Sequence, residues 1–223
     1  MYILYGGSFT RTQIVEMVMA EGDIAYELRE IDITRDEHRT PEYLAINPAG
    51  WVPALVTPDG ETLYETPAIS LYLSEHHDLT QLAPRTDEPE RGMFLSGLFY
   101  ITDDLEPVMK RYFYPHRFVL RPDDTAGMKQ HSLDIALDRL SVIDQRLSHG
   151  GPFHLGERFS LVDLIMTYWA CYLEPADVLE PYRAVKHCMG LVMDRPKLQA
   201  GFDALQAGKQ EFAQLKARGG GVA

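Results

Sequence analysis

The N-terminal third of the chain alternates short apolar runs with stretches of helical periodicity. Residues 2–5 are apolar, glycines at 6 and 7 interrupt the run, and apolar residues then recur at helical spacing over 14–19 until Gly22. The same reasoning predicts a strand over 26–33, a short helix over 41–46, a strand over 54–57, a second strand through 63 and a helix from 67. Residues 1–77 therefore predict an α/β domain of order β-α-β-α-β-β-α.

Residues 78–90 are polar, contain two prolines and show little periodicity, so they are expected to be a linker. The remainder, 91–223, has helical spacing throughout, with a Gly-rich tail expected to be disordered. Ser160 and Asp163 have the spacing of a capping box at a helix start. Two long helix faces are predicted: Phe94, Leu98, Ile101, Leu105, Val108 and Tyr112, and then Leu133, Leu137, Leu140, Ile143 and Leu147. Segments 182–193 and 196–207 complete an all-α domain.

Composition narrows the range of partners. The chain has 223 residues, 45% hydrophobic content and a net charge of −12, which argues against nucleic acid or anionic membrane as a partner. No apolar run reaches the ~18–20 residues of a membrane span. We expect no signal peptide before the first strand, and the two cysteines follow no metal or disulfide spacing. We expect a cytoplasmic protein without a metal.

The most informative stretch runs from Asn47 to Ile69. Val52-Pro53 ends a loop, and Pro58-Asp59-Gly60 is a turn signal between two short strands. Thr66-Pro67 is typical of a helix N-cap and first helical residue, and the free N–H groups of such a helix start bind carboxylates. Glu65, just before, is placed to accept from an ammonium group. A carboxylate and an ammonium side by side are the head of an amino acid.

This ordered set resembles the glutathione S-transferase superfamily. The resemblance implies a thioredoxin-like N-terminal domain (1–77), a linker (78–90) and an all-helical domain (91–223) with a pocket for the electrophile. It implies that the Val52–Pro53 bond is cis, that the Val52 backbone pairs with the cysteinyl part of glutathione, and that Glu65 and Thr66 hold its γ-glutamyl head.

The resemblance also implies an activity. We expect a homodimeric enzyme that adds the thiolate of glutathione, its co-substrate, to a small hydrophobic electrophile. Two alternatives stay open: a non-catalytic module that binds glutathione or hydrophobic ligands or interacts with proteins, and a glutathione-dependent isomerase or peroxidase.

The group that activates the thiol is sought in the loop after the first strand, where the superfamily places a Tyr, Ser or Cys. Ser8 and Thr10 are the two catalytic candidates, with Ser8 preferred, and Tyr5 is a third. A hydroxyl donor together with a helix N-terminus can lower the pKa of a thiol. No cysteine occurs in this loop, so the cysteine-dependent classes are disfavoured.

The glycine carboxylate of glutathione requires a donor from residues 35–51, for which His38, Arg39 and the indole N–H of Trp51 are candidates. Trp51 stands where the superfamily often has Lys, Arg or Gln. For some classes, an aspartate of the partner subunit reaches the glutathione amine, a role open to Asp103 or Asp104. The electrophile pocket is expected to draw on Tyr100, Asp103, Asp104, Met109, Lys110, Arg111, Tyr112 and Tyr114.

Overall fold

The computed structural model describes residues 1–7, 10–173 and 176–217. The chain divides into two compact units, one made of residues 1–80 together with the segment from Met193, the other of residues 81–192. The elements of the first unit are β1 (Tyr2–Gly6), α1 (Thr12–Glu21), β2 (Tyr26–Glu30), α2 (Pro41–Leu44), β3 (Ala54–Val56), β4 (Thr62–Tyr64), α3 (Thr66–His76) and α9 (Gln199–Ala217). Those of the second are α4 (Arg91–Phe99), the π-helical segment η3 (Tyr100–Leu105), α5 (Glu106–Phe113), α6 (Thr125–Gly150), α7 (Leu161–Ala170) and α8 (Arg183–Met193).

The first unit is built on a four-stranded mixed sheet of order β2-β1-β3-β4. Strand β1 pairs in parallel with β2 and antiparallel with β3, and β3 pairs antiparallel with β4. In this register Tyr5 lies opposite Ala54, which lies opposite Tyr64. The predicted mixed α/β fold with a helical second part is confirmed.

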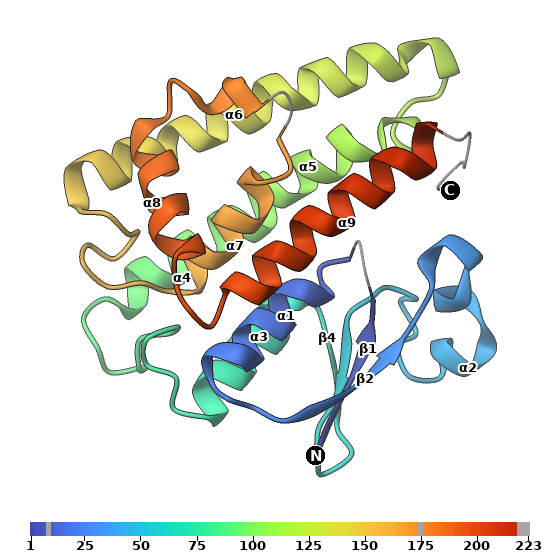
Figure 1. Cartoon of the computed structure of the whole chain (residues 1–223), viewed down its shortest axis with the longest axis horizontal. Helices are drawn as coiled ribbons and strands as arrows, with labels where there is room; N and C mark the ends of the chain where they lie inside the picture. The colour runs from blue at the N-terminus through green and yellow to red at the C-terminus, as the bar shows by residue number, and fades with distance from the viewer. Residues whose placement is uncertain (8–9, 174–175, 218–223) are drawn as a thin grey trace. The chain divides into compact units, whose positions relative to one another are not determined.

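Each face of the sheet is covered by different elements. Helices α1 and α3 lie side by side on one face (Figure 1), over the fully buried Leu4 and Leu55. Because successive side chains of a strand alternate between faces, Tyr5 and Ala54 point the other way. There they form a small core with Tyr43 of α2 and with Val52.

Helix α9 packs against α1, which places the end of the chain in the first unit. Gly201 of α9 lies so close to α1 that a Cβ at this position would come within 2.5 Å of Met17 Cγ. The expected division assigned all of 91–223 to the helical domain. The segment from Met193 instead groups with the first unit, because it contacts α1. Helical periodicity did not reveal this, since the contacting residues are far apart in the sequence.

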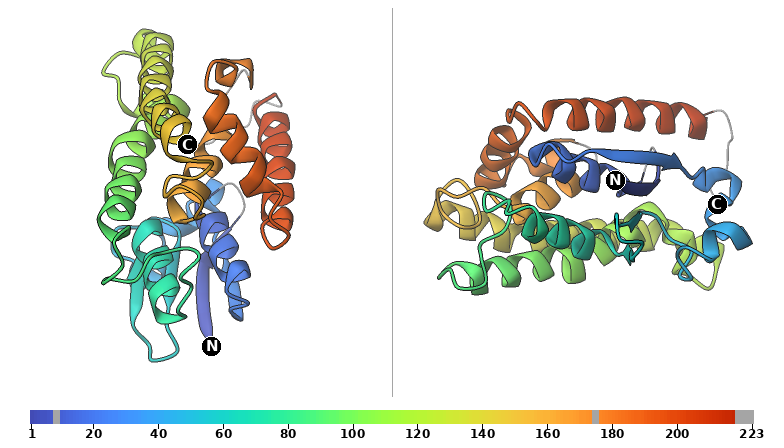
Figure 2. Two further views of the ribbon diagram at one scale, coloured as in Figure 1. Left: turned by 90° about the vertical axis from the view of Figure 1, so that its left-hand side faces the viewer. Right: turned by 90° about the horizontal axis from the view of Figure 1, so that it is seen from below.

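The second unit is a helical bundle in which the short helix α5 packs against part of the much longer α6 (Figures 1 and 2). The helix face predicted over 94–112 is buried throughout, with no member more than 5% exposed. The helix is not uniform, however, because residues 100–105 are π-helical and Pro107 follows in the first turn of α5. A proline lacks the N–H that would continue the α-helical ladder, and π-turns occur where that ladder is disrupted.

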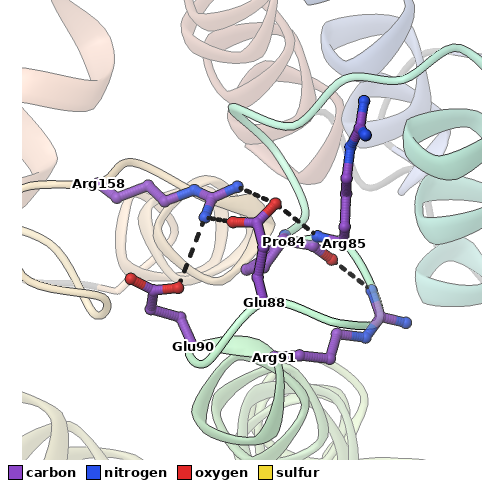
Figure 3. Close-up of polar contacts among 6 residues, drawn as sticks. All are labelled: Pro84, Arg85, Glu88, Glu90, Arg91 and Arg158. Atoms are coloured by element: carbon purple, nitrogen blue, oxygen red, sulfur yellow. Dashed lines mark hydrogen bonds and ion pairs between the residues drawn. The ribbon is translucent and has the colours of Figure 1, made fainter.

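The predicted linker is held against the second unit rather than left loose. The guanidinium of Arg158 forms an ion pair with Glu88 and lies 3.9 Å from a carboxylate oxygen of Glu90 (Figure 3). Arg91 donates to the carbonyl of Pro84 at 2.8 Å. Leu82 is fully buried, and its carbonyl accepts from the backbone N–H of Leu161. From Gln81 onward, the predicted linker therefore belongs structurally to the helical unit.

The predicted capping box at the start of α7 is present. The backbone N–H and the hydroxyl of Ser160 both donate to Asp163 Oδ2 at 2.9 Å, and the backbone N–H of His154 donates to Oδ1 at 2.7 Å. The Cys188 thiol lies 3.7 Å from the same Oδ1. Burial is the main influence on this carboxyl and raises the pKa of Asp163 to about 6.

Some element boundaries differ from the sequence prediction. Strand β2 ends at Glu30 rather than 33, because Asp32 accepts from the backbone N–H of Thr34 and starts a 3₁₀ turn. The N-cap of α3 is Glu65, so Thr66 is its first helical residue. On α6 the buried stripe includes Ser132 and Ala136, while Leu133 and Leu137 are only half-buried.

The expected Gly-rich tail lies outside the described residues. None of the helices described has the length and apolar character needed to cross a membrane.

Candidate functional site

The sheet register brings four loop segments to one edge of the first unit. Tyr5, Ala54 and Tyr64 are aligned across β1, β3 and β4, and Gly6 is aligned with Glu30 of β2. The loop after β1, the loop before β3, the start of α3 and the segment after β2 consequently leave the sheet at the same edge. These are the segments that carry the candidate residues.

Val52 lies two residues before strand β3, at the end of the preceding loop. The Val52–Pro53 peptide bond is cis. The Val52 side chain is buried in the core with Tyr5 and Tyr43. Within the described residues, no hydrogen bond joins the Val52 backbone to another part of the chain. Its N–H and carbonyl can thus pair with an extended ligand as a further strand would.

Glu65 and Thr66 sit at the start of α3. Glu65 has a positive φ of 69° and is exposed, while Thr66 is only 1% exposed. The Thr66 hydroxyl makes no hydrogen bond within the described residues. The first N–H groups of a helix have no partner inside it, and together with the helix dipole they attract a carboxylate. An exposed carboxylate beside this anion-binding helix start suits a zwitterionic amino-acid head.

His38, Arg39 and Trp51 form a layered surface cluster. The rings of His38 and Trp51 are stacked with centroids 6.4 Å apart, and the Arg39 guanidinium carbon lies 4.5 Å from the Trp51 ring centroid. Trp51 is 46% exposed. Arg39 also donates to the carbonyl of Ala49 at 3.3 Å. The structure brings the three candidates for binding the glycine carboxylate into one cluster, in which Arg39 supplies the permanent positive charge.

The three hydroxyl candidates differ in their environments. Ser8 lies outside the described residues. Thr10 is buried, and its hydroxyl donates within the chain, at 2.6 Å from both the carbonyl of Gly7 and the hydroxyl oxygen of Thr12. Tyr5 points into the small core, where its hydroxyl accepts from Arg29 at 2.8 Å. The hydroxyl proton of Thr10 is therefore already donated in a hydrogen bond within the chain. This weakens the case for Thr10 as the hydrogen-bond donor to the thiolate.

The residues expected near the electrophile lie in the second unit. Met109 and Tyr112 are buried, Lys110 pairs with Glu106, and Asp104 pairs with Arg139. Edge-to-face contacts link consecutive rings of an aromatic cluster that consists of Tyr112, Phe113, Tyr172, Tyr168 and Trp169. Trp169 and Tyr168 are buried, as expected of core residues. Among the described residues, no group of three or more His, Cys, Asp or Glu is arranged to hold a metal ion.

Two residues at this edge were missed by the sequence reasoning. Tyr43 Oη donates to the carbonyl of Trp51 at 2.6 Å, and Asn47 Nδ2 donates to the same carbonyl at 2.7 Å. Both residues are only 2% exposed. In the sequence, Asn47 falls in the predicted loop before Val52, and Tyr43 falls in the short helix predicted over 41–46. No sequence pattern showed that the two side chains meet at one carbonyl.

Comparison with known proteins places this geometry in a family. Residues 10–76 match the model of the glutathione S-transferase N-terminal domain. A glutathione S-transferase domain-containing protein of Dictyostelium discoideum is 26% identical, over 83% of this chain and 72% of its own. A maleylacetoacetate isomerase of Pseudomonas aeruginosa is 41% identical over 89 residues, which are 38% of this chain and 42% of its own.

Solved structures agree with the sequence matches. The crystal structure of a glutathione transferase homologue from Sulfitobacter, with bound glutathione, superposes with a TM-score of 0.80. It is 25% identical, and the superposition covers 91% of this chain and 97% of that one. The first unit, with its four segments at one sheet edge, and the helical second unit are thus a known combination. The family model, the relatives and the solved structures together support membership of this chain in the glutathione S-transferase superfamily.

Proposed function

We propose that the first unit binds glutathione at the edge where the four loop segments meet. The observation that carries this proposal is the sheet register, which gathers a free strand-like backbone at Val52, an anion-binding helix start at Thr66 and the exposed carboxylate of Glu65. These groups match, in order, the cysteinyl amide, the γ-glutamyl carboxylate and the γ-glutamyl ammonium. Glutathione bound to the Sulfitobacter homologue supports this choice of ligand.

The reaction we propose is addition of the glutathione thiolate to a small hydrophobic electrophile. The thiol has an unperturbed pKa of about 8.5, and the thiolate is the nucleophile. A hydroxyl donor and the positive end of α1 would stabilise the thiolate, and Ser8 is the proposed donor. The transferases among the relatives support this reaction.

Two other activities use the same glutathione site. The 41% identity to a maleylacetoacetate isomerase favours a glutathione-dependent isomerisation as the second candidate. A non-catalytic binding protein is favoured by the engagement of the Thr10 hydroxyl within the chain. All three proposals require glutathione to bind, so binding is tested first.

Calorimetry on the parent protein and on Glu65→Ala tests the site. Removal of one charged hydrogen-bond partner should weaken glutathione binding by at least about fivefold. Glu61→Ala is the matched control, since Glu61 is an exposed glutamate in the turn between β3 and β4, away from the edge described above. Equal affinity of Glu65→Ala and the parent would refute the assignment of Glu65, and absence of binding by the parent would refute the glutathione site.

A further inference from the structure

The carbonyl of Trp51 accepts two hydrogen bonds from buried side chains. Tyr43 Oη lies 2.6 Å and Asn47 Nδ2 2.7 Å from this oxygen, so that each of its two lone pairs has a donor. We call Tyr43 and Asn47 the carbonyl clamp. Burial raises the pKa of Tyr43 to about 12, so its phenol keeps the donated proton across the physiological range.

The clamp is itself held in place by local contacts. Asn47 Oδ1 accepts from the backbone N–H of Ala49 at 3.1 Å, which orients the amide so that its nitrogen faces Trp51. The backbone N–H of Asn47 donates to the carbonyl of Tyr43 at 2.9 Å. The Tyr43 ring packs against Tyr5 in the small core, with ring centroids 6.3 Å apart. Neither donor is a mobile surface group.

The consequence follows from the geometry of one peptide unit. The carbonyl of Trp51 and the N–H of Val52 belong to the same planar peptide, and in a trans peptide they point in opposite directions. Fixing the carbonyl toward Tyr43 and Asn47 therefore also fixes the direction of the Val52 N–H. This N–H has no partner within the described residues.

We propose that Tyr43 and Asn47 are positioning residues that aim the Val52 N–H at the cysteinyl part of glutathione. The inference rests on the proposed glutathione site and goes beyond it, since both clamp residues are buried and would act through the Trp51–Val52 peptide. They hold the backbone donor in its bound orientation before the ligand arrives, which lowers the ordering cost of binding. The same contact serves ground state and transition state alike, so the clamp should affect KM and leave kcat unchanged.

The variants are chosen to remove the donors and keep the packing. Tyr43→Phe retains the ring, and Asn47→Asp retains the oxygen that accepts from Ala49. Each should raise the Kd for glutathione, and the KM where turnover is measured, about three- to tenfold, with kcat within about twofold of the parent. Tyr2→Phe is the matched control, because Tyr2 is also buried and its hydroxyl lies 2.9 Å from His77 Nε2, at the opposite end of β1.

Amide NMR spectra of ¹⁵N-labelled protein provide a readout that is independent of affinity. In the parent, the Val52 amide signal should shift on saturation with glutathione. In ligand-free Tyr43→Phe it should already differ from the parent, while Tyr2→Phe should leave it in place. Weaker binding in both clamp variants together with these shifts would support the inference.

Three results would overturn it, and they are distinguishable. Clamp variants that bind glutathione as tightly as the parent would refute the clamp and leave the glutathione site standing. A Val52 amide that does not respond to bound glutathione would also refute the clamp alone. Absence of glutathione binding by the parent would refute the proposed function, and the clamp inference with it.

Discussion

Arg195 forms a two-point ion pair with Glu21 at the end of α1, with Nε 2.7 Å from Oε1 and Nη2 2.8 Å from Oε2. The Glu21 side chain is 4% exposed and that of Arg195 is 29% exposed. Lys197 donates to the backbone carbonyl of Glu21 and pairs with Asp23. This contact joins residues 174 positions apart and holds the segment before α9 against the end of α1.

Arg195→Ala should destabilise the first unit, because it leaves the Glu21 carboxylate buried without its cation. We expect a loss of about 1.5–3 kcal/mol in the free energy of unfolding, measured by urea denaturation. Lys186→Ala, which removes the exposed ion pair to Glu180, is the control and should cost less than about 0.5 kcal/mol. Equal effects of the two substitutions would show that the Glu21 pair does not stabilise the fold.

The pKa of Asp163 predicts a pH dependence of stability. Its folded-state pKa of about 6 is above the ordinary value of 3.8, so the folded state binds this proton more tightly than the unfolded state. The stabilisation from the protonated carboxyl is complete below about pH 4 and is lost as the pH rises toward 6. Relative to Asp163→Asn, the parent should lose on the order of 2–3 kcal/mol between pH 4 and pH 7. If the free energies of unfolding of the parent and of Asp163→Asn changed with pH in parallel across this range, the raised pKa would be contradicted.

The thiol-activating hydroxyl can be identified by ultraviolet titration of the bound thiolate. We expect Ser8→Ala to raise the pKa of bound glutathione by about one unit or more and to lower the rate at neutral pH, because one charge-assisted hydrogen bond is lost. Thr10→Ala should leave this titration in place, since the Thr10 hydroxyl donates within the chain. A shift in Thr10→Ala or Tyr5→Phe, and none in Ser8→Ala, would move the role to that residue. No shift in any of the three would favour a non-catalytic binding protein.

The cluster of His38, Arg39 and Trp51 is predicted to recognise the glycine end of glutathione. Arg39→Ala should weaken glutathione binding about three- to tenfold, because the permanent charge of the cluster is lost. The same variant should bind γ-glutamylcysteine, which lacks the glycine, as well as the parent does. Arg35→Ala, which alters an exposed arginine paired with Asp32, serves as control. An equal loss of affinity for both ligands would mean that Arg39 acts on the loop and not on the glycine carboxylate.

A homodimer is predicted from the exposed apolar side chains of each unit. Tyr64 on the edge strand β4 is 50% exposed, and Phe99 on α4 is 53% exposed. Light scattering at micromolar concentration should give about twice the chain mass of 25.3 kDa. Phe99→Glu should shift the mass toward one chain, because a charge would be placed in a desolvated contact. A single-chain mass for the parent protein would refute the dimer.

Local signals in the sequence were sufficient for much of the fold. The apolar periodicity over 94–112 predicted a helix face that is buried, and the Ser160–Asp163 spacing predicted a capping box that is present. Both features depend on residues within a few positions of one another, and helical spacing and capping are local effects. The order of strands and helices in the first 77 residues is readable for the same reason.

What the sequence left open depends on contacts between distant residues. Periodicity cannot show that α9 returns to α1, since this needs Arg195 to reach Glu21 and Gly201 to leave room for Met17. The π-helical segment before Pro107 reflects how a disrupted ladder is accommodated in a packed bundle.

The candidate site shows the same division. The sequence alone determined which residue types could bind an amino-acid head, because Glu65 and Thr66 are neighbours at a helix start. Only the tertiary structure decided that Tyr43 and Asn47 converge on one carbonyl and that Arg39 and His38 both lie against the Trp51 ring. Side-chain hydrogen bonds and stacking depend on the positions of loops that the sheet register brings together, and no local pattern specifies that register.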